Sequence, residues 1–447
     1  MFQITGKYTT ANVMINNVEE SCVAQISGFV NHPAFCNPVA IMPDTHAGKG
    51  SVIGFTMPLS DKVIPNVIGV DIGCGMLSIN IGKSLPIGLD LLDHRIRKFI
   101  PFGMNVRSRS DGVIHFKNDF PFKDVMRSSI AFKQSYNNKY GIDFYIPQYD
   151  MEWFEEMCNR IGMDLGRAIN SVATLGGGNH FIELGQSSNN GDYWLTIHTG
   201  SRNLGKRVCD YWQNMATKIV KNEKQEKLNE MIKNIRATYK GMEIKTKIKE
   251  ARESVGLDVM VNDALQYLEG DDAFGYFSDM IFCQKYAEMN RLYIGKVICK
   301  NILGIEFDTN LQMIESIHNF IDFRDFVIRK GAIRSYVGEK MIIPFNMRDG
   351  ILICEGKSNP EWNFSAPHGA GRVMSRTQAK KAVQLVDFQK SMEGIFSTSV
   401  GNGTLDESPF VYKDSKLIED AIEPTATIID RIKPIMNLKD SMGNEND

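Results

Sequence analysis

Residues 66 to 76 carry the most informative pattern in the chain: Asn66-Val67-Ile68-Gly69-Val70-Asp71-Ile72-Gly73-Cys74-Gly75-Met76. Apolar residues that favour β-structure lead up to Asp71, and glycine then takes every second position. This pattern predicts a buried strand that ends in a tight turn. The turn carries the carboxylate of Asp71 and the thiol of Cys74, and the glycines beside Cys74 let the backbone approach a bound group closely. We therefore expect the turn to hold a metal ion.

Two predicted strands precede this turn. Val39–Met42 is a short apolar run that leads into residues 43–50, which we expect to form a polar loop, and residues 51–58 form the next strand. Loops at the ends of strands are common positions for site residues. The sequence thus predicts that residues 1–80 are rich in strands, with polar loops gathered near the glycine-rich turn.

A second glycine-rich motif lies in the middle of the chain. The apolar spacing over residues 151–172 predicts helix, and Leu175-Gly176-Gly177-Gly178-Asn179-His180 follows it, ahead of an alternating strand. Residues 193–205 then predict a strand, a Gly/Ser/Arg loop and the start of a helix. In both segments a histidine lies where a predicted strand begins or ends, just as Cys74 lies in the turn at the end of the first predicted strand.

The segment from Lys206 to Arg252 is predicted to be helical and basic. It holds thirteen Lys and Arg against six Asp and Glu, a net charge of +7. It could contact the phosphates of a nucleic acid, or it could be an ordinary solvated amphipathic helix, and the sequence favours neither. A second long helix is expected near residues 273–300.

The chain shows no internal Gly/Ser linker and no internal repeat. We therefore predict one α/β (α+β) catalytic domain over residues 1–440, with central sheets and a mainly helical insertion at 206–300. Residues 441–447 are polar and are predicted to be a disordered tail.

Composition sets limits on the class of protein. Hydrophobic residues make up 43% and charged residues 23% of the 447 residues, which is typical of a globular protein with a sizeable core. There is no apolar run long enough for a membrane span and no signal-peptide pattern, so we expect a cytoplasmic protein. The eight scattered cysteines, none in a CxxC pair, are expected to be reduced thiols. A net charge of −2 excludes a generally basic coat but allows a local basic face.

Five of the eight histidines sit beside strands in turns that contain glycine or asparagine. They are His46, His180, His198, His318 and His368. Any one of them is more often a hydrogen-bonded structural residue than a ligand. As a set with Asp71 and Cys74, they suit a borderline divalent metal such as Mn, Zn, Fe or Co. Because a thiolate can bridge two metals, the set could hold a pair of ions.

Several long motifs together resemble the RtcB family of RNA-splicing ligases. The resemblance spans roughly residues 40 to 440, with the motifs in family order. They are Met42-Pro43-Asp44-Thr45-His46, residues 69–76, Gly176-Gly177-Gly178-Asn179-His180-Phe181, His198-Thr199-Gly200-Ser201-Arg202 and His368-Gly369-Ala370-Gly371-Arg372. A combination of this length is far more specific than a lone glycine-rich motif.

The resemblance implies a GTP- and manganese-dependent enzyme that acts on RNA. It would join a 2′,3′-cyclic phosphate or 3′-phosphate end to a 5′-hydroxyl end, in tRNA splicing or RNA repair. The reaction would run through a histidine–GMP intermediate and an activated RNA-3′-pp-5′-G end. An archease-like protein would be a candidate activator.

The resemblance also assigns roles to residues of this chain. Carried over by motif, the ligands of two Mn ions would be Asp71, Cys74, His180, His198 and His318, with Cys74 bridging. The residues that contact the nucleotide would be Asn179, Glu183, Asn346, Tyr412 and Lys439. Arg202 and Arg372 would hold phosphates or RNA. His368 would be the nucleophile. Asp44 is a candidate to orient its imidazole, although an aspartate that only stabilises its loop is an equal alternative.

One segment departs from the family pattern. Phe345 and Asn346 stand after a proline where typical members carry Gly-Ser, in a loop that contacts the guanine nucleotide. This departure puts guanine preference in question. Two alternatives to the ligase are a metal-dependent RNA 3′-end phosphoesterase without ligation and a non-catalytic RNA-binding protein. A guanylylated histidine would serve only the ligase.

Overall fold

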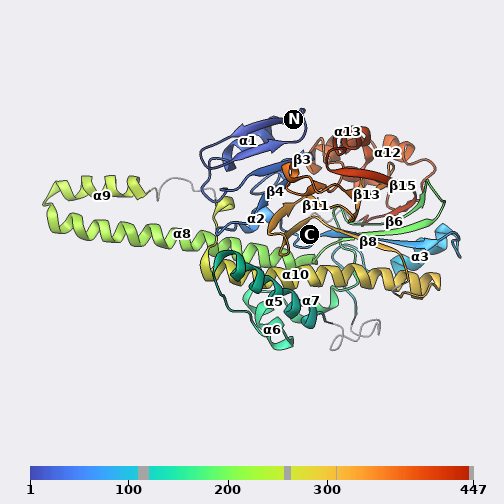
Figure 1. Ribbon diagram of the computed structural model, residues 1–447, viewed down its shortest axis with the longest axis horizontal. Coiled ribbons are helices and arrows are strands. Elements are labelled where there is room, and N and C mark those ends of the chain that lie inside the picture. The colour runs from blue at the N-terminus through green and yellow to red at the C-terminus, as the bar shows by residue number, and fades with distance from the viewer. Residues whose placement is uncertain (109–119, 256–262, 309, 442–447) are drawn as a thin grey trace.

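The computed structural model describes residues 1–108, 120–255, 263–308 and 310–441. The predicted tail at 441–447 thus lies almost entirely outside the described residues. The fold is a mixed α/β arrangement of three sheets with helices around them, so the predicted fold class is confirmed (Figure 1). Within the described ranges, none of the helices combines the length and the apolar character needed to cross a membrane.

The strands form three sheets. In spatial order, the six-stranded sheet holds β1 (Phe2–Thr5), β2 (Thr10–Val13), β3 (Val39–His46), β4 (Ile53–Pro58), β10 (Val327–Lys330) and β9 (Asn319–Asp322). The seven-stranded sheet holds β12 (Lys340–Pro344), β13 (Ile351–Gly356), β15 (Ala426–Leu438), β6 (Phe181–Ser187), β7 (Tyr193–Thr199), β5 (Gly75–Gly82) and β8 (Met313–Ile317). The two-stranded sheet pairs β11 (Ala332–Arg334) with β14 (Ser365–Pro367). It links the larger sheets, because β11 contacts β8 and β4 while β14 contacts β3.

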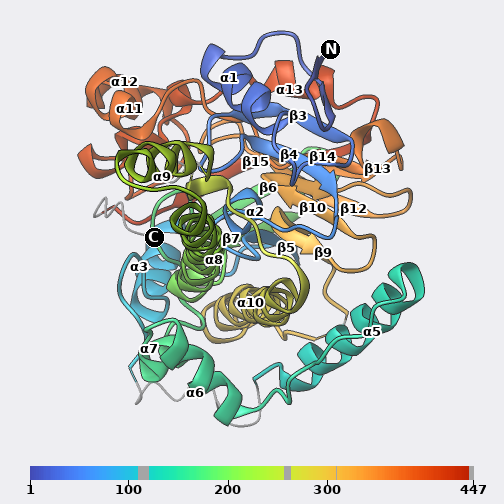
Figure 2. The same ribbon diagram turned by 90° about the vertical axis from the view of Figure 1, so that its left-hand side faces the viewer.

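The helices before the middle of the chain are α1 (Glu20–Phe29), α2 (Pro65–Ile68), α3 (Leu89–Phe99), α5 (Phe122–Tyr140), α6 (Met151–Arg160) and α7 (Leu165–Asn170). Those that follow are α8 (Arg202–Thr238), α9 (Met242–Val255), α10 (Gly270–Lys296), α11 (Arg376–Ala382), α12 (Leu385–Ser391) and α13 (Ser415–Ala421). Helix α10 packs against β5 and β7 and is buried along most of its length. It therefore forms much of the core beneath the seven-stranded sheet (Figure 2).

Several predicted elements are present. Helices α6 and α7 lie in the stretch predicted to be helical, and β7 followed by α8 matches the predicted strand, loop and helix. Helices α8, α9 and α10 occupy most of the segment predicted to be a helical insertion. That this segment is an insertion into a single domain stays a prediction.

The strand predicted to lead into Asp71 is wrong. Pro65–Ile68 forms the short helix α2, and the strand β5 begins only after Cys74. Pro65 occupies the first helical turn, where its fixed φ suits a helix and its missing N–H costs nothing. The apolar run is buried because α2 packs against α8 and strand β10, so tertiary contacts override its strand propensity.

The predicted loop at 43–50 is also wrong in its first half. Strand β3 continues through Pro43 to His46, and Asp44 is completely buried. The register of β3 against β4 shifts between Ile41 and His46, which is where a proline without an N–H can be accommodated in a ladder. As a result, Asp44 is held by a sheet and not by a loop.

Candidate functional site

Four neighbouring strands of the seven-stranded sheet bring one candidate ligand each to the same edge. Their spatial order is β6, β7, β5, β8. His180 precedes β6, His198 lies near the end of β7, Cys74 precedes β5 and His318 follows β8. Antiparallel pairing places His198 opposite both Met76 and Phe181, next to the Cys74 and His180 positions. Sheet topology therefore gathers ligands that are up to 244 residues apart in sequence.

The polar atoms of these side chains face one another. The Sγ atom of Cys74 lies 3.4 Å from Nε2 of His198 and 3.5 Å from Nε2 of His180. The Nε2 atoms of His198 and His318 are 3.3 Å apart. Asp71 joins through its Oδ2 atom, 3.0 Å from Nε2 of His180. Imidazole nitrogens, a thiol and a carboxylate thus converge on one small volume.

Backbone carbonyls fix the orientation of two of these rings. The Nδ1 atom of His180 donates to the carbonyl of Leu175, and Nδ1 of His198 donates to the carbonyl of Asn179. A carbonyl can only accept, so in the neutral ring the lone pair is on Nε2, which faces the cluster. Burial lowers the pKa of His198 well below its usual value, so this ring is neutral and able to bind a metal.

Asp71 is held in place by the loop that follows β7. Its Oδ1 atom accepts from the backbone N–H of Ser201, and a Cβ at Gly200 would lie 2.3 Å from that same oxygen. Only glycine therefore fits at position 200. Burial alone would raise the pKa of Asp71, but hydrogen bonding and charge from His180 lower it, so the carboxylate is ionised.

The donor set fits a pair of metal ions. Asp71, Cys74 and His180 form one group whose ligand atoms lie within 4.8 Å of one another, and Cys74, His198 and His318 form a second. Cys74 belongs to both groups, which is the arrangement a bridging thiolate needs. Burial and the neighbouring Asp71 raise the pKa of the Cys74 thiol well above its usual value, and a metal cation is the kind of partner that reverses such a shift.

His368 lies beside this cluster and directly follows β14 of the two-stranded sheet. Its ring centroid is 4.7 Å from that of His318, and its Nδ1 atom is 2.7 Å from Oδ2 of Asp44. The imidazole keeps 18% of its surface exposed, whereas Asp44 is completely buried. The backbone turn after His368 depends on Gly371, which has φ +75° and whose Cβ would lie 2.0 Å from the Asp44 carbonyl oxygen.

A second buried polar cluster lies opposite and is built around Glu407. The carboxylate accepts from Tyr412 at 2.8 Å, Lys439 at 2.9 Å and Arg376 at 2.7 Å. Arg372 adds a contact at 3.5 Å. Although burial opposes ionisation, these cations lower the pKa of Glu407 well below its usual value.

Glu183 is buried beside the two clusters, and no cation among the described residues forms an ion pair with its carboxyl group. Its Oε2 atom accepts from the Asn437 side chain at 2.8 Å, and its Oε1 atom is buried with no partner among the described residues. Burial raises the pKa of Glu183 to about 8. Glu183 lines the same cavity as the clusters, where a ligand with N–H groups could bond to its carboxyl group.

The cavity has a volume of about 290 Å³. Its walls include Cys74, His198, His318, His368 and Glu183, which brings together both clusters and the nucleophile candidate. Predicted site residues that also line it are Asp71, Asn179, Asn346, Arg372, Tyr412 and Lys439. Of the predicted residues, His180 and Arg202 line the neighbouring cavity, and Asp44 supports His368 from behind.

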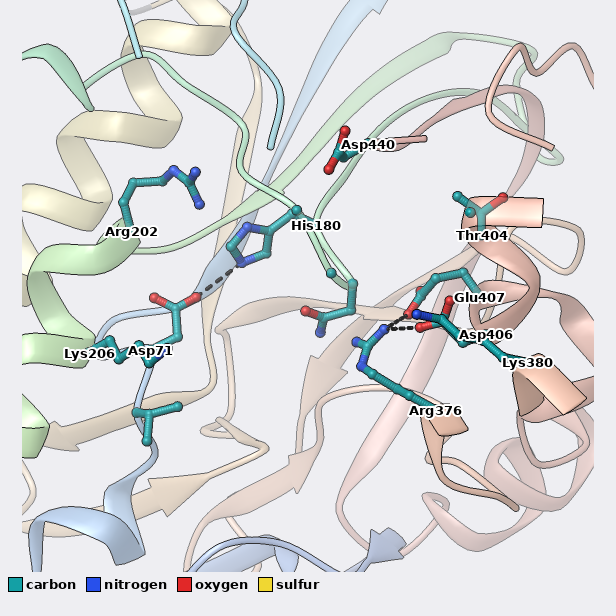
Figure 3. A pocket seen from close by; sticks show the side chains of 15 residues that line it. Asp71, His180, Arg202, Lys206, Arg376, Lys380, Thr404, Asp406, Glu407 and Asp440 are labelled. Carbon is teal, nitrogen blue, oxygen red and sulfur yellow. Dashed lines mark hydrogen bonds and ion pairs between the residues drawn. The ribbon is translucent and has the colours of Figure 1, made fainter. Parts of the chain in front are cut away.

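That neighbouring cavity, of about 210 Å³, is a cleft on the other side of Asp71, and we call it the basic cleft after four of its side chains. These are Arg202, Lys206, Arg376 and Lys380, and the lining also holds the acidic side chains of Asp71, Asp406, Glu407 and Asp440. In Figure 3, Asp71 and His180 form one wall, and Arg376 with Asp406 and Glu407 forms the opposite wall. Asp71, Asn179, Arg376 and Glu407 line both cavities, so the two are adjacent.

The two arginines predicted to hold phosphates are engaged with the chain itself. Arg202 donates to the carbonyl of Gly103 at 2.7 Å and to the Thr174 hydroxyl at 3.2 Å. Arg372 donates to the Asp406 carbonyl at 2.7 Å and lies over the Tyr412 ring. Both guanidinium groups thus have structural partners next to the cavities, and their phosphate-binding role stays a prediction.

The loop that departs from the family pattern is ordered by its own side chains. Asn346 donates to Asp349 at 2.7 Å and accepts from the backbone N–H groups of Arg348 and Asp349. Phe345 is 4% exposed and packs in a separate apolar cluster. Asn346 borders the cavity, but most of its hydrogen-bonding capacity is already used within the loop.

Three site residues were not found from the sequence: Arg376, Glu407 and Asn437. The only sequence signal for Arg376 is its spacing of four residues from Arg372. Glu407 follows another acid in an irregular segment, and Asn437 shares an alternating strand with ordinary core residues. Their positions depend on tertiary contacts that no local pattern encodes.

Fold and site together define a mixed α/β protein with a candidate metal site in the wall of a cavity. Residues 25–440 match the family model described as tRNA-splicing ligase RtcB, so the chain belongs to the RtcB family. The RNA-splicing ligase RtcB of Escherichia coli K12 is 26% identical over 446 residues, covering 94% of this chain and 95% of the relative. The tRNA-splicing ligase RtcB of Nanoarchaeum equitans is 24% identical, covering 97% and 94%. The Entamoeba histolytica RNA-splicing ligase RtcB homolog 1 is 23% identical, covering 94% and 83%.

Proposed function

We propose that this chain is an RNA ligase that uses GTP and two manganese ions. It joins RNA ends that carry a 3′-phosphate or a 2′,3′-cyclic phosphate to ends that carry a 5′-hydroxyl. Membership in the RtcB family supports RNA ligation, and the relatives carry ligase names. The observation that carries the mechanism is the His368–Asp44 pair, which sits directly beside the ligand cluster.

His368 is the proposed nucleophile. Asp44 accepts a hydrogen bond from Nδ1–H, which leaves the lone pair on Nε2 and stabilises the positive charge that develops as the ring reacts. Nε2 attacks the α-phosphorus of GTP, a P–N bond forms, the bond to the β-phosphate breaks and pyrophosphate leaves. Because Asp44 is completely buried in β3, the imidazole is oriented before the nucleotide arrives.

Asp71, Cys74, His180, His198 and His318 would hold the two ions. When bound, the ions supply positive charge that stabilises the phosphate oxygens during in-line transfer. The chain keeps these ligands neutral or oriented in advance through burial and through the carbonyls of Leu175 and Asn179. The donor set suits zinc as well as manganese, and manganese is proposed from the family resemblance.

The guanine nucleotide is proposed to occupy the cavity next to His368. Glu183 can accept from base N–H groups through its unpartnered Oε1 atom, next to Asn437. Asn179, Tyr412 and Lys439 line the same space, with Asn346 at its border. Tyr412 and Lys439 are tied to Glu407, so they contribute fixed contact surfaces rather than mobile side chains.

RNA is proposed to enter through the basic cleft. A cyclic phosphate end is first opened by water to a 3′-phosphate. A 3′-phosphate oxygen then attacks the phosphorus of His368–GMP, the P–N bond breaks and RNA-3′-pp-5′-G forms. The incoming 5′-hydroxyl attacks the RNA phosphate and GMP leaves. This activation is needed because a phosphate monoester oxygen is a poor leaving group.

Incubation with GTP labelled at the α-phosphate and Mn²⁺ tests the proposal. The wild-type protein should acquire an acid-labile, base-stable label, as a phosphoramidate does, and His368→Ala should acquire none. Asp44→Asn keeps the shape of the side chain but disturbs the tautomer, so labelling should slow about a hundredfold or more. No label with GTP or any other nucleoside triphosphate would refute the ligase. Release of 3′-phosphate without ligation would establish the phosphoesterase instead.

A further inference from the structure

Helix α8 begins at the site and then leaves the body of the protein. Its first residue, Arg202, lines the basic cleft, and its 37 residues correspond to about 55 Å of helix. Figure 1 shows the outer part of α8 projecting away from the sheets, with α9 folded back beside it. We call residues 218–255 the arm.

The two helices of the arm pack on each other. Leu228 on α8 and Ala251 on α9 are only 2% and 3% exposed, although the arm projects from the body. Lys247 on α9 also lies over the ring of Tyr239 on the connection between the helices. The arm is therefore a helical hairpin with a buried seam, which can hold charges at fixed positions.

The charge of the arm is opposite to that of the rest of the chain. It holds eleven Lys and Arg against six Asp and Glu, a net charge of +5, while the whole chain carries −2. The remaining residues therefore carry a net charge of −7. Nine of the eleven basic residues are exposed: Lys218, Lys221, Lys227, Lys233, Arg236, Lys240, Lys245, Lys249 and Arg252.

These charges are only partly neutralised within the arm. Ordinary solvated helices match basic and acidic residues in pairs three or four apart, as Lys247 does with Glu250 on α9. On α8, in contrast, no carboxylate of the described part of the chain lies within 4.0 Å of the basic nitrogens of Lys227, Lys233 or Arg236. Such positive charge is available to a polyanion.

A polar face of α8 connects the arm to the site. Lys206 lines the basic cleft, and Lys218 and Lys221 border a surface hollow together with Lys49. Positions 206, 210, 214 and 218 follow one another at intervals of four and therefore form one ridge along the helix, and none of them is buried. A chain of phosphates that leaves the cleft along this face would reach the arm.

We propose that the arm binds the phosphate backbone of the RNA substrate at a distance from the ends being joined. This proposal rests on the proposed function for its class of substrate. Lys218 lies sixteen residues beyond Arg202, or about 24 Å along the helix. A strand of B-form DNA has a phosphate about every 3.4 Å, and the A-form duplex of RNA rises less per nucleotide, so duplex RNA must extend at least roughly seven nucleotides from the site to reach it. The arm therefore favours long or folded RNAs over short fragments.

Binding of defined RNAs in the absence of GTP and Mn²⁺ tests this proposal. The variant changes four exposed residues in the full chain: Lys218→Gln, Lys227→Gln, Lys233→Gln and Arg236→Gln. The control carries Lys218→Arg, Lys227→Arg and Lys233→Arg, which keep the charge. The RNAs are a hairpin with a stem of about 24 base pairs and a strand of about three nucleotides, which is too short to span the distance from the site to Lys218, titrated at several salt concentrations.

The glutamine variant should bind the hairpin at least about tenfold more weakly near 0.1 M salt, with a smaller slope of log K against log salt. Its affinity for the short strand should not change, and the arginine control should behave as wild type. Equal hairpin affinity and slope for variant and wild type would overturn RNA binding by the arm and point to an acidic protein partner. If the wild-type protein is not labelled by GTP, only the proposed ligase function is refuted and not RNA binding by the arm, because these titrations need no catalysis.

Discussion

The two buried clusters that meet in the cavity are built on opposite principles. The Cys74 cluster, which comprises Asp71, Cys74, His180, His198 and His318, gathers imidazoles, a thiol and one carboxylate whose polar atoms point at one another. The Glu407 cluster pairs one carboxylate with Arg376 and Lys439 and with a tyrosine hydroxyl. Only the second is electrostatically complete with protein groups alone.

This difference separates what holds the fold from what performs chemistry. A self-sufficient network contributes to stability with or without a ligand, and removing one member leaves charges buried and unpaired. A convergent set of metal-ligand donors instead gains most of its interaction energy when a cation arrives. We therefore expect substitutions in the Cys74 cluster to affect ligand binding and activity, and those in the Glu407 cluster to affect stability first.

The largest expected effect is that of Cys74→Ala. Because Cys74 belongs to both ligand groups, its loss should abolish the paired site and reduce GTP labelling more than about a thousandfold. Thermal unfolding should separate this effect from folding. Mn²⁺ at about 100 times its dissociation constant should stabilise the wild type by about 2.7 kcal/mol and the variant much less.

The matched control is Cys354→Ala, which removes another completely buried thiol that lines neither cavity. It should keep both the Mn²⁺-dependent stabilisation and the labelling. Full labelling of Cys74→Ala would contradict the bridging role. Loss of the metal response in the Cys354 variant would mean that the response reports on the core and not on the ligand set.

How much of each cluster can be predicted from the sequence depends on how close together its residues lie in the chain. The glycine-flanked turn marks Asp71 and Cys74 because a close backbone approach needs glycine within a few residues. The histidines stand out because they flank strands. That Cys74 Sγ lies within 3.5 Å of both His180 and His198 could not be predicted, since it follows from the spatial order β6, β7, β5, which differs from the order in the chain.

The Glu407 cluster could not be predicted from the sequence for the same reason. Arg376, Glu407 and Lys439 come from a helix, a 3₁₀ segment and the end of a strand, with no shared period.

The two wrong predictions of secondary structure have a related cause. Burial by α8 turned an apolar run into α2, and pairing with β4 extended β3 through a proline, so tertiary contacts outweighed propensity in both.

A second prediction compares the buried glutamates of the cavity. The pKa of Glu183 is raised from 4.5 to about 8 by burial, whereas cations lower that of Glu407. Between pH 4.5 and about pH 8, the folded protein keeps a proton on Glu183 that the unfolded chain has released. This residue therefore makes the free energy of unfolding fall as pH rises from about 4.5 to about 8, by an amount on the order of 4 kcal/mol.

Denaturant titrations of wild type and Glu183→Gln across this pH range measure the effect, because the glutamine cannot ionise. The variant should gain stability relative to wild type as pH rises, and the difference should level off above pH 8. Taking the difference between two proteins cancels the titration of other groups, such as the buried histidines. A difference that stays constant with pH would show that Glu183 ionises normally and would remove the contrast between the glutamates.

The smallest of the three effects, Glu407→Gln, tests the stabilising side of the comparison. The substitution keeps the shape of the side chain but leaves Lys439 and Arg376 with an uncharged partner in a buried site, which should cost about 3 kcal/mol at pH 7. The cost should be constant at higher pH and shrink only as pH falls below about 4.5, because the carboxylate of Glu407 stays ionised in the folded protein well below that pH.

Glu419→Gln is the control, since it removes a partly exposed pair with Arg431 and should change stability by less than about 1 kcal/mol. If Glu407→Gln unfolds like the control while Mn²⁺ still stabilises it, the network is not a stabilising element. Glu407 would then belong with the ligand-binding half of the cavity.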